Sequence, residues 1–419
     1  MPSEPPPPPG LVRRAPARVA VAAFLAVVAA STYRAVERHA FEAHGDRGRW
    51  AMTDFRDTLY YPAVAFRAGA NPWAARFADD HPVQRPLPPY GPVVVLAHWP
   101  LGLLPVHVAE VVYFLSTIGL AVAVAGVALR TGGLDARLPS VLALATLLLL
   151  SRPGQQNLLL GQCTLEVVLG CYLGLLQGAR RPALGALGIV LASMKPQFAL
   201  PLALLMLARG DLRAVAAGVA ATGALSLGTL LAAGGPDGPA AWIAAIGRSN
   251  ATVADPAVGW TRIDAGFLAG RGLALPEGAE LTAGAAALLL GLAAFRRALA
   301  TGASTAAPDG LALALACLTI LLPLYHVAYD ALLLTLPIVA LVAAARTPAR
   351  AHAALIALLL VPAVNQLASY PVVRGLAPGE PAWRIVTGIN AAALVAALLH
   401  AAWLARRRPR FLTRLPGSG

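Results

Sequence analysis

Residues 182–208 read PALGALGIVLASMKPQFALPLALLMLA, with the single lysine of the chain, Lys195, near the centre. Arg181 and Arg209 bound this apolar stretch, and arginine clusters favour the cytoplasmic side of a membrane. A helix of this length reaches only about 40 Å, which cannot cross a bilayer core of about 30 Å twice. Pro196 interrupts a helix in the middle of the stretch. We therefore predict a re-entrant hairpin over residues 182–208, made of two half-helices with Lys195 at the tip beside a polar cavity.

The rest of the chain is also strongly apolar. Of its 419 residues, 58% are hydrophobic and 13% are charged, and the mean hydropathy is +0.67. Apolar runs of about 15 to 25 residues recur along almost the full length, which is typical of an all-α, polytopic integral membrane protein. We predict re-entrant and interfacial helices and about ten full spans near residues 17–35, 107–129, 138–152, 163–179, 212–233, 281–296, 309–325, 328–345, 352–369 and 386–405.

Arginine clusters between these runs determine the predicted topology. When all of them are placed in the cytoplasm, both termini are cytoplasmic as well. The first apolar run follows a basic flank and is interpreted as an uncleaved signal-anchor. The predicted organisation is a disordered, proline-rich cytoplasmic tail at 1–16, a transmembrane domain at 17–408 and a cytoplasmic tail at 409–419. The excess of Ala, Gly, Leu and Arg is typical of a GC-rich bacterium, so we expect a bacterial plasma membrane.

Composition also excludes several classes of function. The net charge of +13 comes from short arginine clusters between apolar runs, and these do not form one basic face. We therefore expect no nucleic-acid partner. The three cysteines, Cys163, Cys171 and Cys317, show no CxxC spacing, and the eight histidines are scattered. We expect neither a metal nor a cofactor.

A predicted outer segment, about residues 36–106, carries seven of the 20 acidic residues. Its last part, PYGPVVVLAHWPLGLLP at 89–105, is too short for a span and predicts an interfacial or re-entrant helix. Asp54 and Asp57 lie at i, i+3, so both carboxylates can share one helix face. Acidic residues of an outer loop are more often simply solvated, and that alternative remains open for both.

Three further polar positions are predicted at the same outer side. Gln162 belongs to a polar turn, SRPGQQNLLLGQCTLE at 151–166, whose amides could also serve only as helix caps. His326 and Asp330 lie in a turn between two spans, where a histidine is often only an interfacial packing residue. An ammonium inside a membrane is costly, so Lys195 indicates function, although its side chain could instead snorkel to the interface.

The order of these motifs resembles glycosyltransferase family 87, the polyprenol-phosphate-mannose-dependent mannosyltransferase-like proteins of the GT-C superfamily. The resemblance covers about residues 50–335. It is carried by an early DF with YY.A and G.NPW, then PPYGP…WPLGLLP, a GQ opening a span, a mid-membrane KP and a late histidine turn. Three features depart from the family pattern. The Asn-Gln-Ser segment expected after the central spans is not evident around GWTRIDAGF at 259–267. Thr164 stands where an Asn is usual, and the late turn has one histidine, His326, where paired histidines are common.

The resemblance implies a GT-C-like bundle and an inverting membrane glycosyltransferase. The donor would be a polyprenyl-phosphate sugar, with mannose the expected hexose, and the acceptor a glycolipid or glycan at the outer face of the bilayer. Asp54, or alternatively Asp57, would be the catalytic base. His326 would assist catalysis, and the donor phosphate or sugar would contact Lys195, Gln162, Tyr60 and Tyr61. A lipid or small-molecule transporter, and a non-catalytic assembly protein derived from such an enzyme, are the alternatives.

Overall fold

A computed structural model describes residues 9–42, 51–83, 90–254, 259–276, 278–301, 308–344, 350–367, 370–373 and 375–408. Within these ranges the chain is helical, apart from turns and one isolated β-bridge between Arg262 and Val327. The prediction of an all-α membrane protein is therefore confirmed. The longer helices are α1 (Pro9–Glu42), α6 (Val106–Thr131), α7 (Leu138–Leu150), α9 (Thr164–Gln177), α10 (Pro182–Ala192), α11 (Pro196–Arg209), α12 (Leu212–Gly234), α13 (Gly238–Ala254), α16 (Ala279–Thr301), α17 (Gly310–Leu321), α18 (Thr335–Ala344), α19 (Arg350–Val364) and α21 (Pro381–Arg407).

Five segments of the described chain are long and apolar enough to cross a membrane. They are Pro16–His39, Val106–Thr131, Leu212–Ser249, Ala279–Thr301 and Pro381–Arg407. The remaining predicted spans correspond to shorter apolar helices, among them α7, α17, α18 and α19. Their positions agree closely with the apolar runs, because a run of apolar residues between polar breaks fixes a helix locally.

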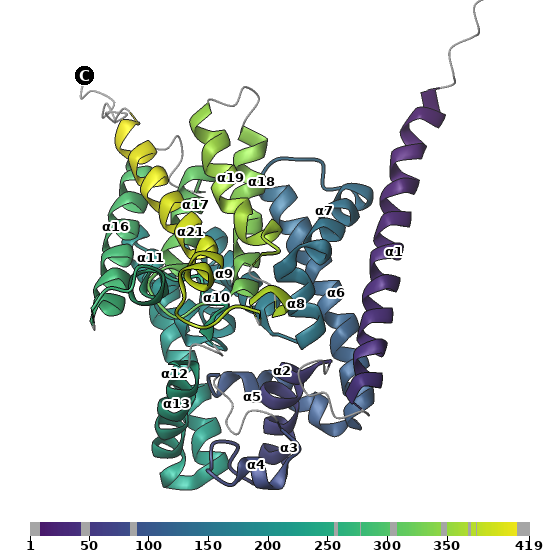
Figure 1. Ribbon diagram of the computed structural model, residues 1–419, viewed down its shortest axis with the longest axis vertical. Coiled ribbons are helices and arrows are strands. Elements are labelled where there is room, and N and C mark those ends of the chain that lie inside the picture. Colours follow the sequence, from purple (N-terminus) through teal and green to yellow (C-terminus); the bar gives the residue numbers. More distant parts are fainter. Residues whose placement is uncertain are drawn as a thin grey trace, which may run out of the picture.

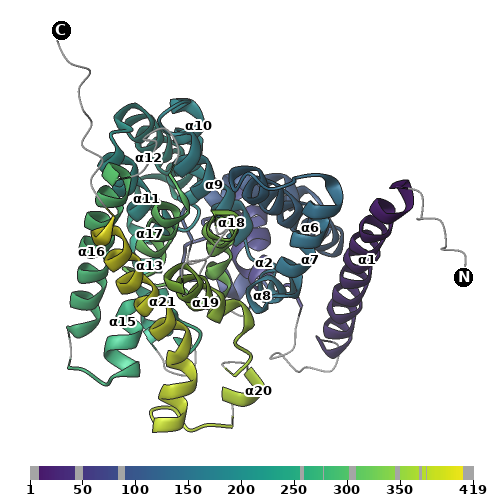
Figure 2. The same cartoon turned by 90° about the horizontal axis from the view of Figure 1, so that it is seen from above.

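The helices form one bundle around α17, in which every residue is buried (Figure 1). Helix α1 packs on α7 along the outside of the bundle (Figures 1 and 2). The C-terminal end of α21 lies at the upper end in Figure 1, where Arg297 donates to the carbonyl of Arg406 and Arg408 pairs with Asp309. Arginine-rich helix ends thus gather at one end of the molecule.

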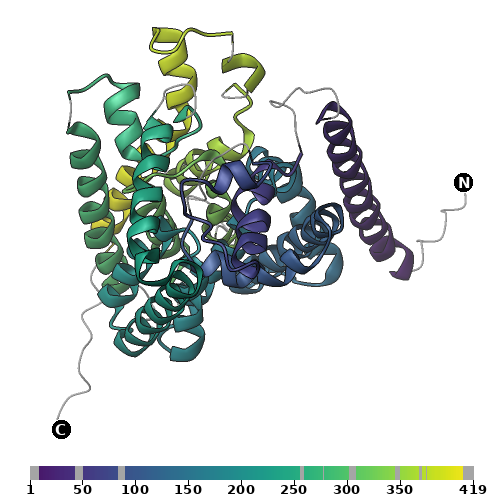
Figure 3. The ribbon, with the colours of Figure 1, turned by 90° about the horizontal axis from the view of Figure 1, so that it is seen from below.

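The opposite end carries the segment between α1 and α6. It contains α2 (Thr53–Phe55), η2 (Arg56–Tyr60), α3 (Tyr61–Arg67), α4 (Phe77–Asp80), α5 (Val93–His98) and η3 (Trp99–Leu103). Figure 3 shows this segment from below, in front of the middle of the bundle. It is anchored there by polar contacts, since the guanidinium of Arg56 pairs with Glu110 of α6 at 2.5 Å and the Tyr60 hydroxyl donates to the carbonyl of Leu104 at 2.8 Å.

Helices α10 and α11 lie side by side and are joined by residues 193–195. A Cβ added at Gly185 of α10 would lie 3.3 Å from Cε of Met206 in α11, which shows that the chain folds back on itself. Pro196 is the first residue of α11, where its missing N–H is not needed. The arginine at the base, Arg209, donates to the carbonyl of Gly174 in α9 at 2.9 Å. The chain thus forms the two half-helices, and their depth in the membrane stays a prediction.

A second break separates α8 (Arg152–Leu160) from α9, and the two helices meet at a bend of 120°. Gly161 makes this bend with φ 71°, a left-handed conformation that favours glycine. A Cβ at this position would lie 2.5 Å from Cβ of Phe55, so the glycine also lets α2 approach the bend. The break therefore brings the outer segment against the end of α8.

The termini differ in part from the predicted tails. Residues 1–8 and 409–419 lie outside the described residues, so the tails predicted there are not described. Residues 9–16, which fall in the predicted tail, belong to α1, which begins at Pro9. Proline is tolerated in the first turn of a helix, and the apolar Leu11 and Val12 continue the pattern of the run that follows.

Candidate functional site

Lys195 lies at the tip between α10 and α11 and is turned into the protein. Its side chain is 1% exposed, and Nζ donates to Oγ1 of Thr164 at 2.8 Å and to Oδ1 of Asp330 at 3.1 Å. The aromatic rings of Tyr329 and Tyr90 lie 4.5 and 5.3 Å from Nζ, within the range of cation–π attraction. These contacts hold the ammonium inside the bundle and are incompatible with snorkelling.

Asp330 joins Lys195 to His326. It lies in η6 (Ala328–Leu334), and its second oxygen, Oδ2, accepts from Nδ1 of His326 at 3.1 Å and from the N–H of Val327 at 3.2 Å. The spacing of His326 and Asp330 places both on one side of this turn. Nε2 of His326 is buried and has no hydrogen-bond partner among the described residues. This nitrogen therefore has unused hydrogen-bonding capacity.

The segment before α15 (Ala265–Phe267) fixes the backbone of His326. The N–H of Ile263 donates to the carbonyl of His326 at 2.9 Å, and the N–H of Ala328 donates to the carbonyl of Thr261 at 2.9 Å. Next to them, Arg262 pairs with Asp264 at 2.7 Å. Burial alone would lower the pKa of Arg262, but the hydrogen bonds and charges of Asp264 and of Glu280 outweigh it and raise that pKa.

Gln162 connects Asp54 of α2 to the same region. Its Nε2 donates to Oδ2 of Asp54, and its Oε1 accepts from the Tyr90 hydroxyl at 2.6 Å. Tyr90 is in turn fixed to the hairpin tip, because the N–H of the next residue, Gly91, donates to the carbonyl of Met194 at 3.0 Å. An ordered path of contacts therefore runs from the carboxylate of Asp54 to the ammonium of Lys195.

We refer to these residues as the polar cluster. They come from five separate parts of the chain, and all are buried: Asp54, Tyr90, Gln162, Thr164, Lys195, His326 and Asp330. Buried polar groups are stable when they satisfy one another, and here each side chain contacts at least one other member. The predicted residues Asp54, Gln162, Lys195 and His326 are thus brought together.

Asp57, Tyr60 and Tyr61 lie nearby but differ in their contacts. Asp57 is buried one turn after Asp54. The hydrogen bond from Gln162 goes to the carboxylate of Asp54. Tyr60 uses its hydroxyl on the backbone of η3. The ring of Tyr61 packs edge-on against Tyr60, with ring centroids 5.1 Å apart.

Three members of the polar cluster were not among the predicted site residues: Tyr90, Thr164 and Asp330. Their shared contact with Lys195 was not predicted either. Asp330 carried a signal, since it lies four residues after His326 in an apolar run. Thr164 stood out as a departure from the family pattern. Its hydroxyl accepts from Lys195 and donates to Oδ1 of Asp330 at 3.3 Å, so this position serves the polar cluster directly.

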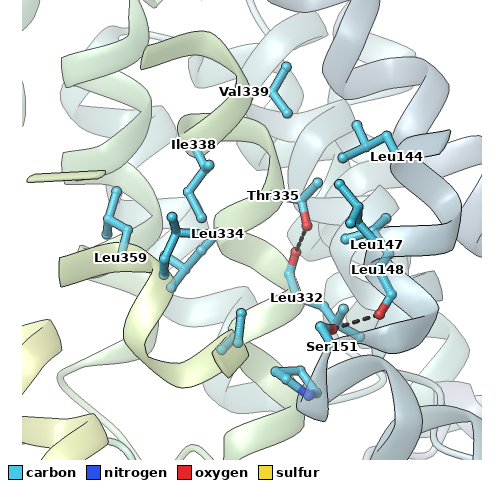
Figure 4. A pocket seen from close by; sticks show the side chains of 14 residues that line it. Leu144, Leu147, Leu148, Ser151, Leu332, Leu334, Thr335, Ile338, Val339 and Leu359 are labelled. Carbon is cyan, nitrogen blue, oxygen red and sulfur yellow. Dashed lines mark hydrogen bonds between the residues drawn. The ribbon is translucent and has the colours of Figure 1, made fainter. Parts of the chain in front are cut away.

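An apolar cavity of about 180 Å³ adjoins the polar cluster between α7, α8, η6, α18 and α19 (Figure 4). Its walls are mostly aliphatic: Leu144, Leu147, Leu148, Ser151, Pro153, Ala331, Leu332, Leu334, Thr335, Ile338, Val339, Leu359, Leu360 and Ala363. Ala331, which lines the cavity, directly follows Asp330 in η6. An apolar cavity of this kind accepts an apolar group.

Comparison with known proteins gave one match. A family model described as glycosyltransferase family 87 matches residues 89–324. The matched range contains Tyr90, Gln162, Thr164 and Lys195 and ends just before His326. No curated protein and no solved structure matches the chain.

Proposed function

The chain belongs to glycosyltransferase family 87 and is a membrane glycosyltransferase. From this premise we propose that it transfers a hexose from a polyprenyl-phosphate sugar, and that the transfer takes place at the polar cluster. Mannose is the expected sugar. The acceptor is a hydroxyl of a lipid-linked sugar or a polysaccharide, and the reaction inverts the anomeric configuration. The observation that carries the proposal is the continuous path of contacts from Asp54 through Gln162, Tyr90 and Lys195 to Asp330 and His326.

Asp54 is proposed as the general base. Its carboxylate removes the proton of the acceptor hydroxyl while that oxygen attacks the anomeric carbon. The bond between the anomeric carbon and the phosphate oxygen breaks, and its electron pair leaves with the lipid phosphate. The amide of Gln162 donates to Oδ2 of Asp54 and so holds the carboxylate in one orientation. Asp57 is the alternative base on the same helical segment.

Lys195 and His326 are proposed to face the donor. The ammonium of Lys195 has three N–H groups, and Thr164 and Asp330 use two of them, so the third can donate to a phosphate oxygen. Nε2 of His326 can hydrogen-bond to an oxygen that gains charge in the transition state. Tyr60 and Tyr61 are proposed to border the donor sugar from the outer segment.

The arrangement in the membrane is part of the proposal. The arginine-rich helix ends lie opposite the segment that carries Asp54, as the positive-inside rule requires of a cytoplasmic and an outer end. Both termini would then be cytoplasmic, with the polar cluster towards the outer face of a bacterial plasma membrane. An apolar cavity beside the polar cluster suits a substrate that carries a long apolar chain.

The direct test is transfer of radiolabelled sugar in membranes that contain the full chain. Polyprenyl-phosphate mannose is supplied together with a membrane glycolipid fraction as acceptor, and polyprenyl-phosphate glucose is supplied in a parallel reaction. We expect mannose in the acceptor fraction, and no product with Asp54→Asn at the same protein level. Absence of transfer from either donor would refute the proposal, and transfer from the glucose donor alone would correct the sugar.

A further inference from the structure

Arg152, the first residue of α8, is a buried cation that has no carboxylate partner in the described part of the chain. It is 4% exposed, Nη1 donates to the carbonyl of Asn365 at 2.9 Å, and the buried Nη2 has no hydrogen-bond partner among the described residues. Its guanidinium lies 6.0 Å from the ring of Trp260, which supplies no full charge. Other arginines of low exposure differ in having carboxylate partners, in the pairs Arg56–Glu110, Arg209–Asp211 and Arg262–Asp264.

A charge removed from water costs free energy unless an opposite charge and hydrogen bonds compensate it. Among the described residues Arg152 has one neutral acceptor and no anion. A planar guanidinium with a free N–H edge is the group that binds carboxylates and phosphates best. The geometry at Arg152 therefore indicates an anionic ligand.

The position of Arg152 indicates which kind of anion. The residues on both sides of it, Ser151 and Pro153, line the apolar cavity (Figure 4), and its partner Asn365 lies two residues beyond Ala363 on the facing wall. An apolar cavity of about 150 Å³ is large enough to hold a molecule of the size of benzene. A ligand that fits both features has an anionic head and an apolar chain.

Charge balance in the polar cluster supports the same ligand. The charge of Lys195 is already matched by Asp330 at 3.1 Å, and Asp54 adds a second carboxylate. This set cannot by itself neutralise an incoming phosphate. The ring of Trp260 lies 6.0 Å from the guanidinium of Arg152. The next residue, Thr261, accepts with its carbonyl from the N–H of Ala328, two residues after His326. Arg152 is therefore a nearby cation whose positive charge no described carboxylate balances.

We propose that Arg152 and the apolar cavity form the binding site for the phosphate and the adjoining chain of a lipid phosphomonoester. The inference rests on the proposed function, in which that lipid is the sugar donor. Arg152 supplies the positive charge that Lys195 shares with Asp330, and the cavity holds the first apolar units next to the phosphate.

The test compares a polyprenyl monophosphate with the corresponding polyprenol, which has the same chain and no phosphate. Binding of each lipid to the full chain in nanodiscs of neutral lipid is measured by native mass spectrometry. The variants are Arg152→Met and Arg152→Lys, with Arg137→Met as the matched control. Arg137 lies just before the other end of α7, where its side chain is 81% exposed. Leu359→Trp, which fills the cavity, tests the chain-binding part.

We expect the unmodified protein to prefer the phosphate over the alcohol by about 10 to 100-fold, the scale of charge-assisted contacts. Arg152→Met should remove most of this preference, leaving the part that Lys195 supplies, and should still bind the alcohol, which also shows that the variant is folded. Arg152→Lys should keep part of the preference, and Arg137→Met all of it. Leu359→Trp should weaken both lipids alike.

Three results of the binding measurement would overturn the inference. The first is an unchanged phosphate preference in Arg152→Met. The second is displacement of the polyprenyl monophosphate when phosphatidylglycerol is added to the nanodiscs, which would identify a bulk lipid as the ligand. The third is its displacement by inorganic phosphate, which would identify a free ion as the ligand. Arg152-dependent binding in a protein that transfers no sugar would support the site and refute the proposed function. Sugar transfer whose donor dependence is unaffected by Arg152→Met would refute the site and leave the proposed function standing.

Discussion

The ammonium of Lys195 lies 3.1 Å from Oδ1 of Asp330, although 135 residues separate the two in the chain. Both side chains are 1% exposed. Each charge therefore depends on the other, because water cannot solvate either of them. The pair also connects the hairpin tip to the turn that carries His326, since the second oxygen of Asp330 binds Nδ1 of that histidine.

Removal of one partner of this pair is expected to destabilise the fold. Lys195→Met leaves Asp330 buried without a counter-charge, which typically costs about 3–5 kcal/mol. The double variant Lys195→Met/Asp330→Asn has neither charge and should recover most of that loss. Thermal unfolding in detergent measures the difference. A single variant as stable as the unmodified protein would show that the pair does not contribute as described.

Asp54→Asn is expected to reduce the rate of transfer by about two to four orders of magnitude, because the amide keeps the shape of the side chain and cannot accept the proton. Asp57→Asn is the matched control and should retain most of the rate. Initial rates are compared in membranes at equal protein level. The reverse order of the two variants would make Asp57 the base, and normal rates in both would exclude general-base catalysis by this segment.

His326→Gln is expected to slow transfer by about ten- to a thousandfold, the effect of losing one group that stabilises developing charge. Unfolding temperature and membrane abundance should change little if the role is chemical. His400→Gln is the control, because Nε2 of His400 donates to the carbonyl of Ala351 in another part of the bundle. Full activity of His326→Gln would remove the imidazole from the reaction.

The proposed orientation predicts which sites an impermeant thiol reagent can reach from outside intact cells. In a background without the three native cysteines, Ala75→Cys and Asp237→Cys should react, because both positions are exposed at the end that carries the outer segment. Leu134→Cys, in the exposed connection between α6 and α7, should react after lysis alone. The opposite labelling pattern would invert the chain in the membrane.

Local features of the sequence were sufficient to predict the positions of the helices and the break at Lys195. The apolar runs predicted the positions of α6, α12, α16 and α21 to within a few residues, because a helix satisfies its own backbone hydrogen bonds. The break was predictable for a similar reason. Proline removes a backbone donor at a definite position, and the arginines at both ends made a single crossing inconsistent.

The partners inside the site were decided by the tertiary structure. The sequence contains Asp54, Gln162, Lys195 and His326 as candidates, but it does not show that Gln162 binds Asp54 or that Asp330 is the counter-ion of Lys195. In the sequence Arg152 is one more arginine of a polar turn; only the structure shows that it is buried and has no carboxylate partner among the residues described. The amino-acid sequence determines which charged and polar side chains are present and which segments form helices. Charge compensation depends on distances of a few ångströms between segments far apart in the chain, and packing alone sets those distances.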